Sequence, residues 1–542
     1  MRVLGVEGTA WAASAAVFAY EADPAVGEVT ALESEAYRPD AGGLHPREAA
    51  EHMREAVPAV VEAVLDDAGP IDAVAFSRGP GLGPCLRIVG SAARALAGTL
   101  GVPLVGVNHM VAHLEVGRHF SGFGAPVCLN ASGANAHVLA LHGGRYRVLG
   151  ETMDTGVGNA LDKFARHLDW GHPGGPKIEA RARDGEYVDL PYVVKGMDFS
   201  FSGLTSAAIE ATEDHPVADV CFSLQENAFG MLTEVAERAL SLTGRDELVL
   251  GGGVGQNDRL REMLAAMCEA RGAEFFTPEP RFLRDNAAMI AILGARMHGA
   301  GETVAIEDSA IDPGFRPDEV EVAWRTAEPP PDPSEGPVRG AEATVDIDET
   351  VEKRRVEKGY RHPALDRRLR RDRTVMEARL ASEARRRGVP TPVVYDVDVP
   401  AATLTLQRVG DRDLRDAPTP ERVRAVAGHL ATLHGAGLVH GDPTTRNVRV
   451  AEADGSGAAA DTGAAADSDG ERVVLIDFGL GYHTDDVEDY AMDLHVLGGS
   501  LRGTAPDPEE LVGAVEAGYR DAGGDPAVLD RLAEIAGRGR YQ

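Results

Sequence analysis

The sequence is poor in lysine and cysteine. Only five lysines occur in 542 residues, and the four cysteines are isolated, with no Cys-x-x-Cys pair. This pattern argues against a disulfide framework and a thiolate zinc site, so we expect buried, reduced thiols. No apolar run approaches the roughly 20 residues of a membrane-spanning helix, and the first residues lack the regions of a signal peptide. We therefore expect a soluble, cytoplasmic protein with no membrane partner.

The charge is strongly unbalanced. Acidic residues outnumber basic ones 86 to 54, and the formal net charge is -32. An acidic, lysine-poor composition is typical of proteins from salt-loving archaea, where dissolved salt screens repulsion between charges. Such a charge ordinarily disfavours a nucleic-acid partner, but high salt weakens that long-range effect. Local basic patches must therefore be judged one at a time.

A Pro-rich polar stretch divides the chain. It spans residues 326–338 and cannot pack as a helix or a central strand. Because 542 residues exceed the usual size of one core, we predict a first domain at 1–325 and a second at 339–542. A run of Ala, Gly, Asp and Ser at 452–471 predicts a disordered insertion in the second domain.

Two segments of the first domain look like copies of one unit. A strand at residues 3–9 leads to an apolar strand near 14–20, and a strand at 127–133 leads to another near 137–141. Each pair is followed by a glycine-containing turn and a third strand-like run. Two such lobes facing each other predict an α/β domain with an actin-like ATPase (ASKHA) fold.

Two histidines lie one helical turn apart after a strand predicted at 103–107. Asn108 can cap a helix, which places His109 and His113 at positions i and i+4 on one face. This spacing suits a divalent metal, and it fits a surface or core pair equally well. A metalloprotease is excluded, because Met110 stands where His-Glu-x-x-His has its glutamate base.

A third metal ligand is predicted at Asp285, which begins a helix running toward Gly299. A carboxylate at a strand-to-helix junction suits chemistry, and the alternative is a helix N-cap. The glycine turn at 251–255 follows a buried strand and favours close approach of a phosphate. The helix after it carries an apolar face formed by Leu260, Met263, Leu264 and Met267.

Eight short motifs occur along the first domain. In chain order they are Glu7–Ala10, His109-x-x-x-His113, Ser132–Asn135, Gly156–Lys163, Gly174–Glu179, Asp198–Leu204, Gly251–Asn257 and Asp285–Met289. Together these motifs resemble the universal tRNA threonylcarbamoyltransferase family over residues 1 to about 325. The resemblance implies an actin-like fold and transfer of a threonylcarbamoyl group from threonylcarbamoyl-AMP to the exocyclic amine of tRNA adenosine 37. The acceptor tRNAs are those that read codons beginning with adenine.

The same resemblance implies the ligands of the site. His109, His113 and Asp285 would hold one divalent metal, with iron favoured and zinc possible. Archaeal members usually have a metal-binding tyrosine where this chain has Asn130. A carbonyl ligand from Asn130, a water or a looser site would then replace it. The residues implied to bind threonylcarbamoyl-adenylate are Asn130, Ala131, Ser132, Gly133, Ala134, Asp162, Gly175, Glu179 and Asn257.

The second domain carries kinase-like elements in order. Asp442 and Asn447, followed by the Asp477-Phe478-Gly479 triplet, match a kinase pattern. In that pattern Asp442 accepts the hydroxyl proton, and Asn447 and Asp477 hold magnesium. Lys353 on a short strand and Glu377 on a helix predicted at 373–387 fit the ion pair that positions ATP phosphates. A full glycine-rich loop is missing, and its ATP-binding place would fall to Gly340, Ala341, Glu342 and Ala343.

With the segment at 358–363, these elements resemble the small atypical kinase of the KEOPS tRNA-modification complex over about 339–542. The resemblance implies a small α+β, protein-kinase-like (RIO-like) fold that uses ATP and magnesium. Pro443 and Arg446 stand where that family usually has Leu and Ser, which argues against efficient protein phosphorylation. Basic residues at 353–387 could contact tRNA phosphates or form a solvated helix face.

Together the two resemblances predict a bifunctional tRNA-modifying enzyme whose second domain is an ATPase or regulatory serine/threonine kinase. The expected partners are tRNA, threonylcarbamoyl-AMP, ATP and other KEOPS subunits. Two alternatives remain open. One is a protein kinase with an N-terminal nucleotide-binding scaffold, and the other is a small-metabolite kinase of the actin-like class.

Overall fold

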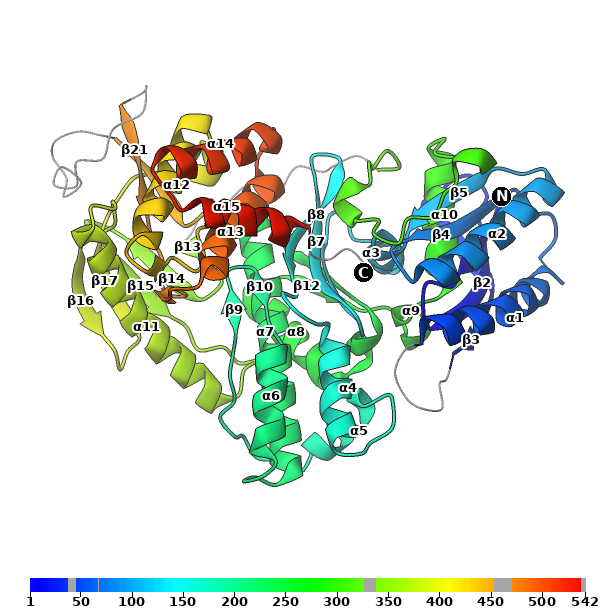
Figure 1. Ribbon diagram of the computed structural model, residues 1–542, viewed down its shortest axis with the longest axis horizontal. Helices are drawn as coiled ribbons and strands as arrows, with labels where there is room; N and C mark the ends of the chain where they lie inside the picture. The colour runs from blue at the N-terminus through cyan, green and yellow to red at the C-terminus, as the bar shows by residue number, and fades with distance from the viewer. Residues whose placement is uncertain (38–44, 67, 326–337, 453–469, 538–542) are drawn as a thin grey trace.

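The computed structural model describes residues 1–37, 45–66, 68–325, 338–452 and 470–537, and its class is mixed α/β. Most of the linker predicted at 326–338 and of the insertion predicted at 452–471 lies outside the described residues. Figure 1 shows two lobes followed by a C-terminal unit, with the second lobe in the middle. The second lobe therefore has neighbours on two sides.

The first lobe is built on a five-stranded sheet with the order β3-β2-β1-β4-β5. Strands β1 to β3 form an antiparallel meander, and β4 pairs in parallel with both β1 and β5. Parallel pairs need long crossover connections, which α1 and α2 supply. The bounds are β1 (Arg2–Glu7), β2 (Ala12–Ala19), β3 (Glu28–Ala36), α1 (Pro46–Leu65), β4 (Ala73–Gly79), α2 (Gly83–Leu100) and β5 (Leu104–Asn108).

The second lobe repeats this topology in the sheet β12-β11-β6-β7-β8. Strands β6 to β8 form the meander, and β11 pairs in parallel with β6 and β12. The predicted duplication of one unit is confirmed. The strands are β6 (Val127–Ala131), β7 (Ala136–His142), β8 (Arg145–Glu151), β9 (Val194–Lys195), β10 (Asp198–Phe199), β11 (Glu247–Gly251) and β12 (Glu274–Phe276). The helices are α4 (Val157–His167), α5 (Gly175–Ala182), α6 (Ser202–Ala211), α7 (Val217–Thr243) and α8 (Asp258–Arg271).

Helices α3 (His109–Ser121) and α10 (Ala287–Gly299) pack against each other between the two sheets. Their core includes Val3 from the first sheet and Val249 from the second, so one apolar cluster joins the lobes. The approach is close: a Cβ on Gly5 of β1 would lie 2.5 Å from the carbonyl oxygen of Ala287. Glycine is therefore required at that position.

Helix α10 does not begin where the sequence predicted. Asp285 is not its N-cap; Asn286 is, and its side chain accepts a hydrogen bond from the Met289 amide. Because Asn286 satisfies the helix end, the carboxylate of Asp285 is left to make other contacts. Asp285 follows the short helix α9 (Pro280–Leu283).

The C-terminal unit combines an antiparallel sheet, β13-β14-β15-β17-β16, with a group of helices. Helix α11 begins earlier than the predicted Arg373, because His362 caps it and Pro363 occupies its first turn. The sheet strands are β13 (Val338–Arg339), β14 (Ala343–Ile347), β15 (Thr350–Arg355), β16 (Val394–Asp398) and β17 (Thr403–Gln407). The helices are α11 (Pro363–Arg386), α12 (Pro420–His434), α13 (Val487–Thr504), α14 (Pro508–Asp521) and α15 (Pro526–Ala536).

Helix α7 of the second lobe faces the C-terminal unit, and most of its residues are buried. Its buried residues include Glu234, Glu237 and Arg238. Buried charges are costly unless they are paired, and these side chains pair with one another, with α8 and with the neighbouring unit. Helix α13 also packs against β8 of the second lobe.

All four cysteines are buried and free, as the sequence predicted. Within the described ranges, no helix is both long and apolar enough to cross a membrane.

Candidate functional site

A cavity of about 1430 Å³ lies between the two lobes. Its lining comes from both meanders, from the start of α3, from the glycine turn after β11 and from the segment before α10. Ala131, fully buried in β6, is the predicted ligand that does not line this cavity. The predicted residues that do line it are His109, His113, Asn130, Ser132, Gly133, Ala134, Asp162, Gly175, Glu179, Asn257 and Asp285.

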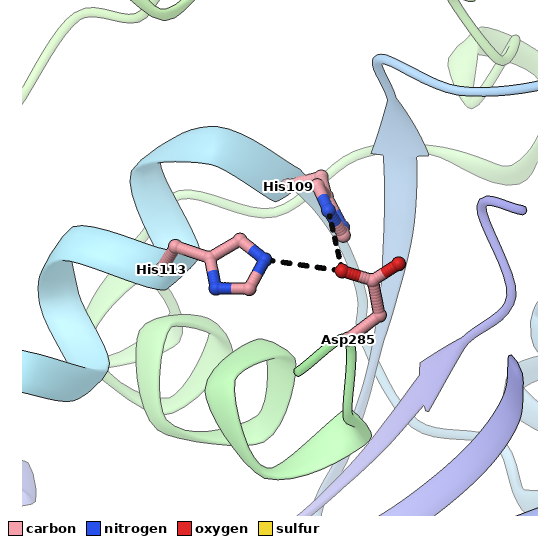
Figure 2. A group of neighbouring side chains, drawn as sticks. All are labelled: His109, His113 and Asp285. Carbon is pink, nitrogen blue, oxygen red and sulfur yellow. Dashed lines mark hydrogen bonds and ion pairs between the residues drawn. The ribbon is translucent and has the colours of Figure 1, made fainter. Parts of the chain in front are cut away.

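The structure brings His109, His113 and Asp285 together (Figure 2). The side chain of Asn108 caps α3 by accepting from the amides of Met110 and Val111, as the sequence predicted. The two histidines therefore project from consecutive turns. One Asp285 oxygen lies 3.4 Å from Nε2 of His109 and 3.3 Å from Nε2 of His113. All three ligand atoms lie within 4.8 Å of one another.

A buried carboxylate supports this group from behind. Glu7, at the end of β1, places an oxygen 3.2 Å from Nδ1 of His109 and accepts hydrogen bonds from the Thr9 amide and the Ser77 hydroxyl. Burial lowers the pKa of His109, but the carboxylates of Glu7 and Asp285 outweigh it and raise that pKa to about 10. Binding a cation here would displace a proton from His109.

The donor set fits a transition metal. Two imidazole nitrogens and one carboxylate are typical ligands of iron or zinc, whereas magnesium and calcium prefer oxygen alone. Burial lowers the pKa of His113, which favours the neutral imidazole that binds metal. Among the described residues, the buried Oδ1 of Asn130 and Nδ1 of His113 have no hydrogen-bond partner. Asn130 thus keeps an acceptor available beside the group.

The second lobe supplies a wall of turns and helix starts. The turn at 132–135 lies against the start of α4, where the amides of Gly158 and Asn159 donate to the carbonyls of Ser132 and Gly133. Helix α5 begins at the cavity, and no side chain caps its first turn. An uncapped helix N-terminus attracts anions. Asp162 accepts from the Gly174 amide at 2.6 Å and fixes this loop.

The glycine turn after β11 completes the wall. Gly252 has a φ of 85°. A Cβ there would lie 2.3 Å from the carbonyl oxygen of Ala131, so only glycine fits. Asn257 caps α8 and donates to Gln225, so its side chain is largely used inside the protein. Glu179 accepts a hydrogen bond from the Asp258 amide.

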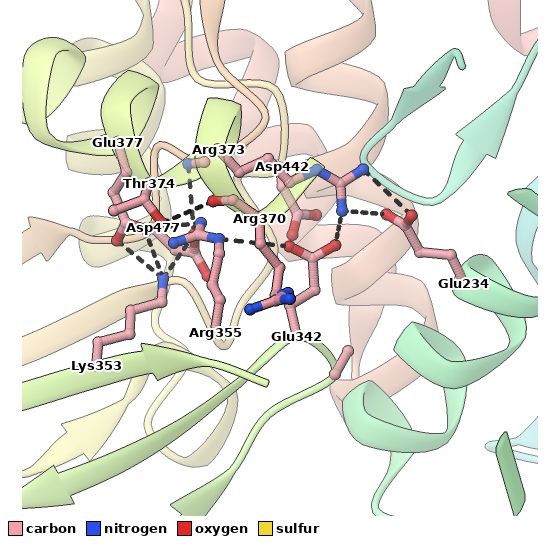
Figure 3. A network of polar contacts seen from close by, with 12 residues as sticks. Glu234, Glu342, Lys353, Arg355, Arg370, Arg373, Thr374, Glu377, Asp442 and Asp477 are labelled. Carbon is pink, nitrogen blue, oxygen red and sulfur yellow. Dashed lines mark hydrogen bonds and ion pairs between the residues drawn. The ribbon is translucent and has the colours of Figure 1, made fainter. Parts of the chain in front are cut away.

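The second predicted site lies in the C-terminal unit (Figure 3). The predicted ion pair is present: Nζ of Lys353 lies 2.8 Å from Glu377 and also 2.8 Å from Asp477. Asn447 donates to Asp442 at 2.8 Å. Asp477 has a φ of 63°, a strained value for this residue type that is concentrated at functional sites.

An arginine from the second lobe, not foreseen from the sequence, enters this site. Arg238 of α7 donates to Asp442 at 2.7 Å and to Glu342 at 3.0 Å. Burial raises the pKa of Asp442 to about 6, against the opposing charge of Arg238. The one sequence feature that could have indicated this contact is the position of Arg238 among the apolar residues of a long helix.

The loop expected to bind ATP is fixed by neighbours. The amide of Gly340 donates to Ala343 at 2.9 Å, and Lys358 donates to the carbonyl of Ala341. The Glu342 carboxylate binds Arg238 and Arg373. Glu342 therefore faces arginines from both units.

The basic segment at 353–387 is only partly exposed. Lys358 binds Glu237 at 2.6 Å, Arg361 binds Glu234 at 2.6 Å, and Arg373 binds Glu234 at 3.0 Å. These three cations are buried between the units, so for them both sequence interpretations, tRNA contacts and a solvated face, are wrong.

Comparison with known proteins gives one consistent result. Residues 27–292 match the family model described as TsaD, tRNA N6-adenosine threonylcarbamoyltransferase. A "probable bifunctional tRNA threonylcarbamoyladenosine biosynthesis protein" of Halobacterium salinarum is 69% identical and covers 100% of this chain and 99% of its own. The protein of that name from Haloarcula marismortui is 62% identical over 100% of both chains. Among solved structures, full-length HypF gives a TM-score of 0.40 at 11% identity over 55% of each chain, a similarity too weak to support an inference about this chain.

Proposed function

Since the chain belongs to the family of bifunctional tRNA threonylcarbamoyladenosine biosynthesis proteins, we propose that the cavity between its lobes is the transferase site. The reaction moves the threonylcarbamoyl group from threonylcarbamoyl-AMP to the exocyclic amine of tRNA adenosine 37. The observation that carries this proposal is the convergence of His109, His113 and Asp285 on the cavity, with Glu7 behind them.

The residues of the cavity suit this chemistry. The amine attacks the carbamoyl carbon, the carbon–oxygen bond to phosphate breaks, and AMP leaves while the amine loses a proton. His109, His113 and Asp285 would hold a metal, which would supply Lewis acidity to the site. The uncapped start of α5 suits the negative charge of the adenylate. Glu7 keeps His109 oriented through its Nδ1 atom.

The C-terminal unit is proposed to be an ATPase or kinase that regulates the transferase. The ordered contacts of Lys353, Glu377 and Asp477 support ATP and magnesium binding, with Asn447 beside Asp442. Arg238 binds Asp442, so the proposed proton acceptor is in contact with the neighbouring lobe. This proposal includes the division at 1–325 and 339–542, an actin-like first domain and a kinase-like second one. Other KEOPS subunits as partners and a cytoplasmic location remain predictions.

The test is threonylcarbamoyl transfer in vitro onto a tRNA that reads codons beginning with adenine. His113→Ala should abolish product, since it removes a proposed metal ligand, while Asp442→Ala should only slow repeated turnover. His167→Ala is the matched control, because His167 is exposed on α4 outside the cavity lining. Unchanged product in both test variants would overturn the proposal.

A further inference from the structure

The cavity has more room than one small ligand uses. Its volume of about 1430 Å³ exceeds the roughly 300 to 1,000 Å³ of ordinary ligand pockets. Under the proposed function, the second-lobe wall and the metal ligands hold the acyl-adenylate. The facing wall comes from the first lobe, between Thr9 and Tyr37, and has no assigned ligand. Two reactants must meet here, so this wall is where the second one fits.

Trp11 is the largest flat side chain on this wall. It lies in the turn between β1 and β2, is partly exposed and lines the cavity. Its carbonyl accepts from the Tyr37 amide at 2.7 Å, which holds the turn in place. The backbone that carries the indole is thus held in place.

One face of the indole already carries a nitrogen heterocycle. The imidazole of His172, from the loop after α4, stacks on Trp11 with ring centroids 4.9 Å apart and an interplanar angle of 10°. Nδ1 of His172 lies 3.1 Å from Asp162, which holds the edge of the ring. A flat ring in parallel stacking is the geometry in which aromatic side chains bind unpaired bases.

We propose that Trp11 is the stacking platform for the acceptor adenine of the tRNA, and that His172 leaves the indole face when the base enters. The ligand class is a purine base extruded from a single-stranded loop. This inference rests on the proposed transferase function and adds a positioning residue to it.

The charge of the chain favours recognition by stacking. A net charge of -32 gives no general attraction for phosphates, and high salt weakens the contacts that remain. Stacking uses the neutral face of the base and needs no counterion release. A neutral indole therefore suits this acidic protein better than an added lysine.

The test uses the full-length protein and a full-length tRNA with 2-aminopurine in place of the acceptor adenine. This base has no amine at the reacting position, so its fluorescence reports stacking without turnover. Wild type should quench the fluorescence and Trp11→Ala should not. With ordinary tRNA, Trp11→Ala should raise KM at least tenfold, and Trp11→Phe should restore most of it. Affinity for threonylcarbamoyl-AMP and the thermal midpoint should stay close to wild type.

His172→Ala separates a platform from a simple contact between lobes. If Trp11 acted only by holding His172, both alanine variants would raise the KM for tRNA equally and the proposal would be overturned. The platform predicts no increase for His172→Ala. Quenching that is absent from wild type, or that survives in Trp11→Ala, also overturns it. Transfer onto ordinary tRNA by wild type tests the proposed function separately, so the two failures are distinguishable.

Discussion

The two sites differ in where the partners of their polar groups come from. In the cavity between the lobes, Asn130 Oδ1 and His113 Nδ1 have no partner among the described residues, and the first turn of α5 is uncapped. In the C-terminal unit, Lys353 is paired with Glu377, and Oδ2 of Asp442 is paired with Arg238 of the neighbouring lobe, while Oδ1 of Asp442 has no partner among the described residues. The cavity thus has groups left to bind charged ligands. The site in the C-terminal unit depends on the position of Arg238 in the second lobe.

The largest effect on stability is expected at Glu234, which pairs with several arginines beside the second site. Glu234 of α7 is 1% exposed and binds Arg238, Arg361 and Arg373. Glu234→Gln would leave three buried guanidinium groups without this carboxylate, so we expect a loss of about 3 to 5 kcal/mol in unfolding free energy. Denaturant unfolding measures it.

A surface pair provides the control for that measurement. Glu262 on α8 is 66% exposed and lies 3.6 Å from Arg259. Glu262→Gln should change the unfolding free energy by less than about 1 kcal/mol. Equal midpoints and slopes for the two variants would show that burial between the units does not matter.

In the cavity between the lobes, a substitution at Glu7 should lower the affinity for the metal. Glu7→Gln removes the charge beside Nδ1 of His109, and loss of such a supporting partner typically costs about 10- to 100-fold in affinity. A competition titration with a chelator measures this, and transfer activity should fall in parallel. Glu33→Gln, an exposed position on β3, should leave both unchanged. An unaltered metal affinity in Glu7→Gln would remove Glu7 from the scheme.

The contact of Arg238 with the second site can be tested by its pH dependence. Burial raises the pKa of Asp442 to about 6, and Arg238 opposes that rise. Arg238→Ala should therefore raise the pKa further. Because a proton acceptor must be ionised, the acidic limb of ATP hydrolysis should move to higher pH. Arg238→Lys, which keeps a charge, should shift less, and superimposable profiles for all three proteins would contradict the argument.

The same contrast explains what could be predicted from the sequence. The cavity residues lie in short local motifs, such as Asn108 followed by two histidines, or a glycine turn between a strand and a helix. Secondary structure alone then brings each motif to the end of a strand. The duplicated meander was predictable for the same reason, since alternating apolar runs and turns specify it.

Contacts between distant segments could not be predicted in this way. Arg238 and Asp442 are separated by 204 positions, and nothing in the pattern of α7 names its partner. Lys358, Arg361 and Arg373 looked like part of a surface patch because their acidic partners lie on α7. The start of α10 was misplaced because Asp285 and Asn286 are both good caps, and only the nearby histidines decide between them.

A separate effect, seen only as a pH dependence, is expected at a third boundary, where α13 meets β8. Asp198 is 4% exposed there, and its oxygens lie 2.8 Å from the Glu151 amide and 3.7 Å from His495. Burial raises the pKa of Asp198 to about 8, with a further contribution from the charge of Glu151.

The sign of the pH dependence follows from that pKa. The folded state holds the proton more tightly than the unfolded one, whose carboxyl has a pKa of about 3.9. Stability from Asp198 is therefore complete below that value and declines as the pH rises through about 8. Asp198→Asn cannot ionise, so its thermal midpoint should fall less than that of wild type between these limits. If the thermal midpoints of wild type and Asp198→Asn changed in parallel with pH, Asp198 would be a well-paired group, like those of the second site. If the two midpoints diverged as the pH rises, Asp198 would be a buried carboxylate between the two units that lacks a sufficient partner.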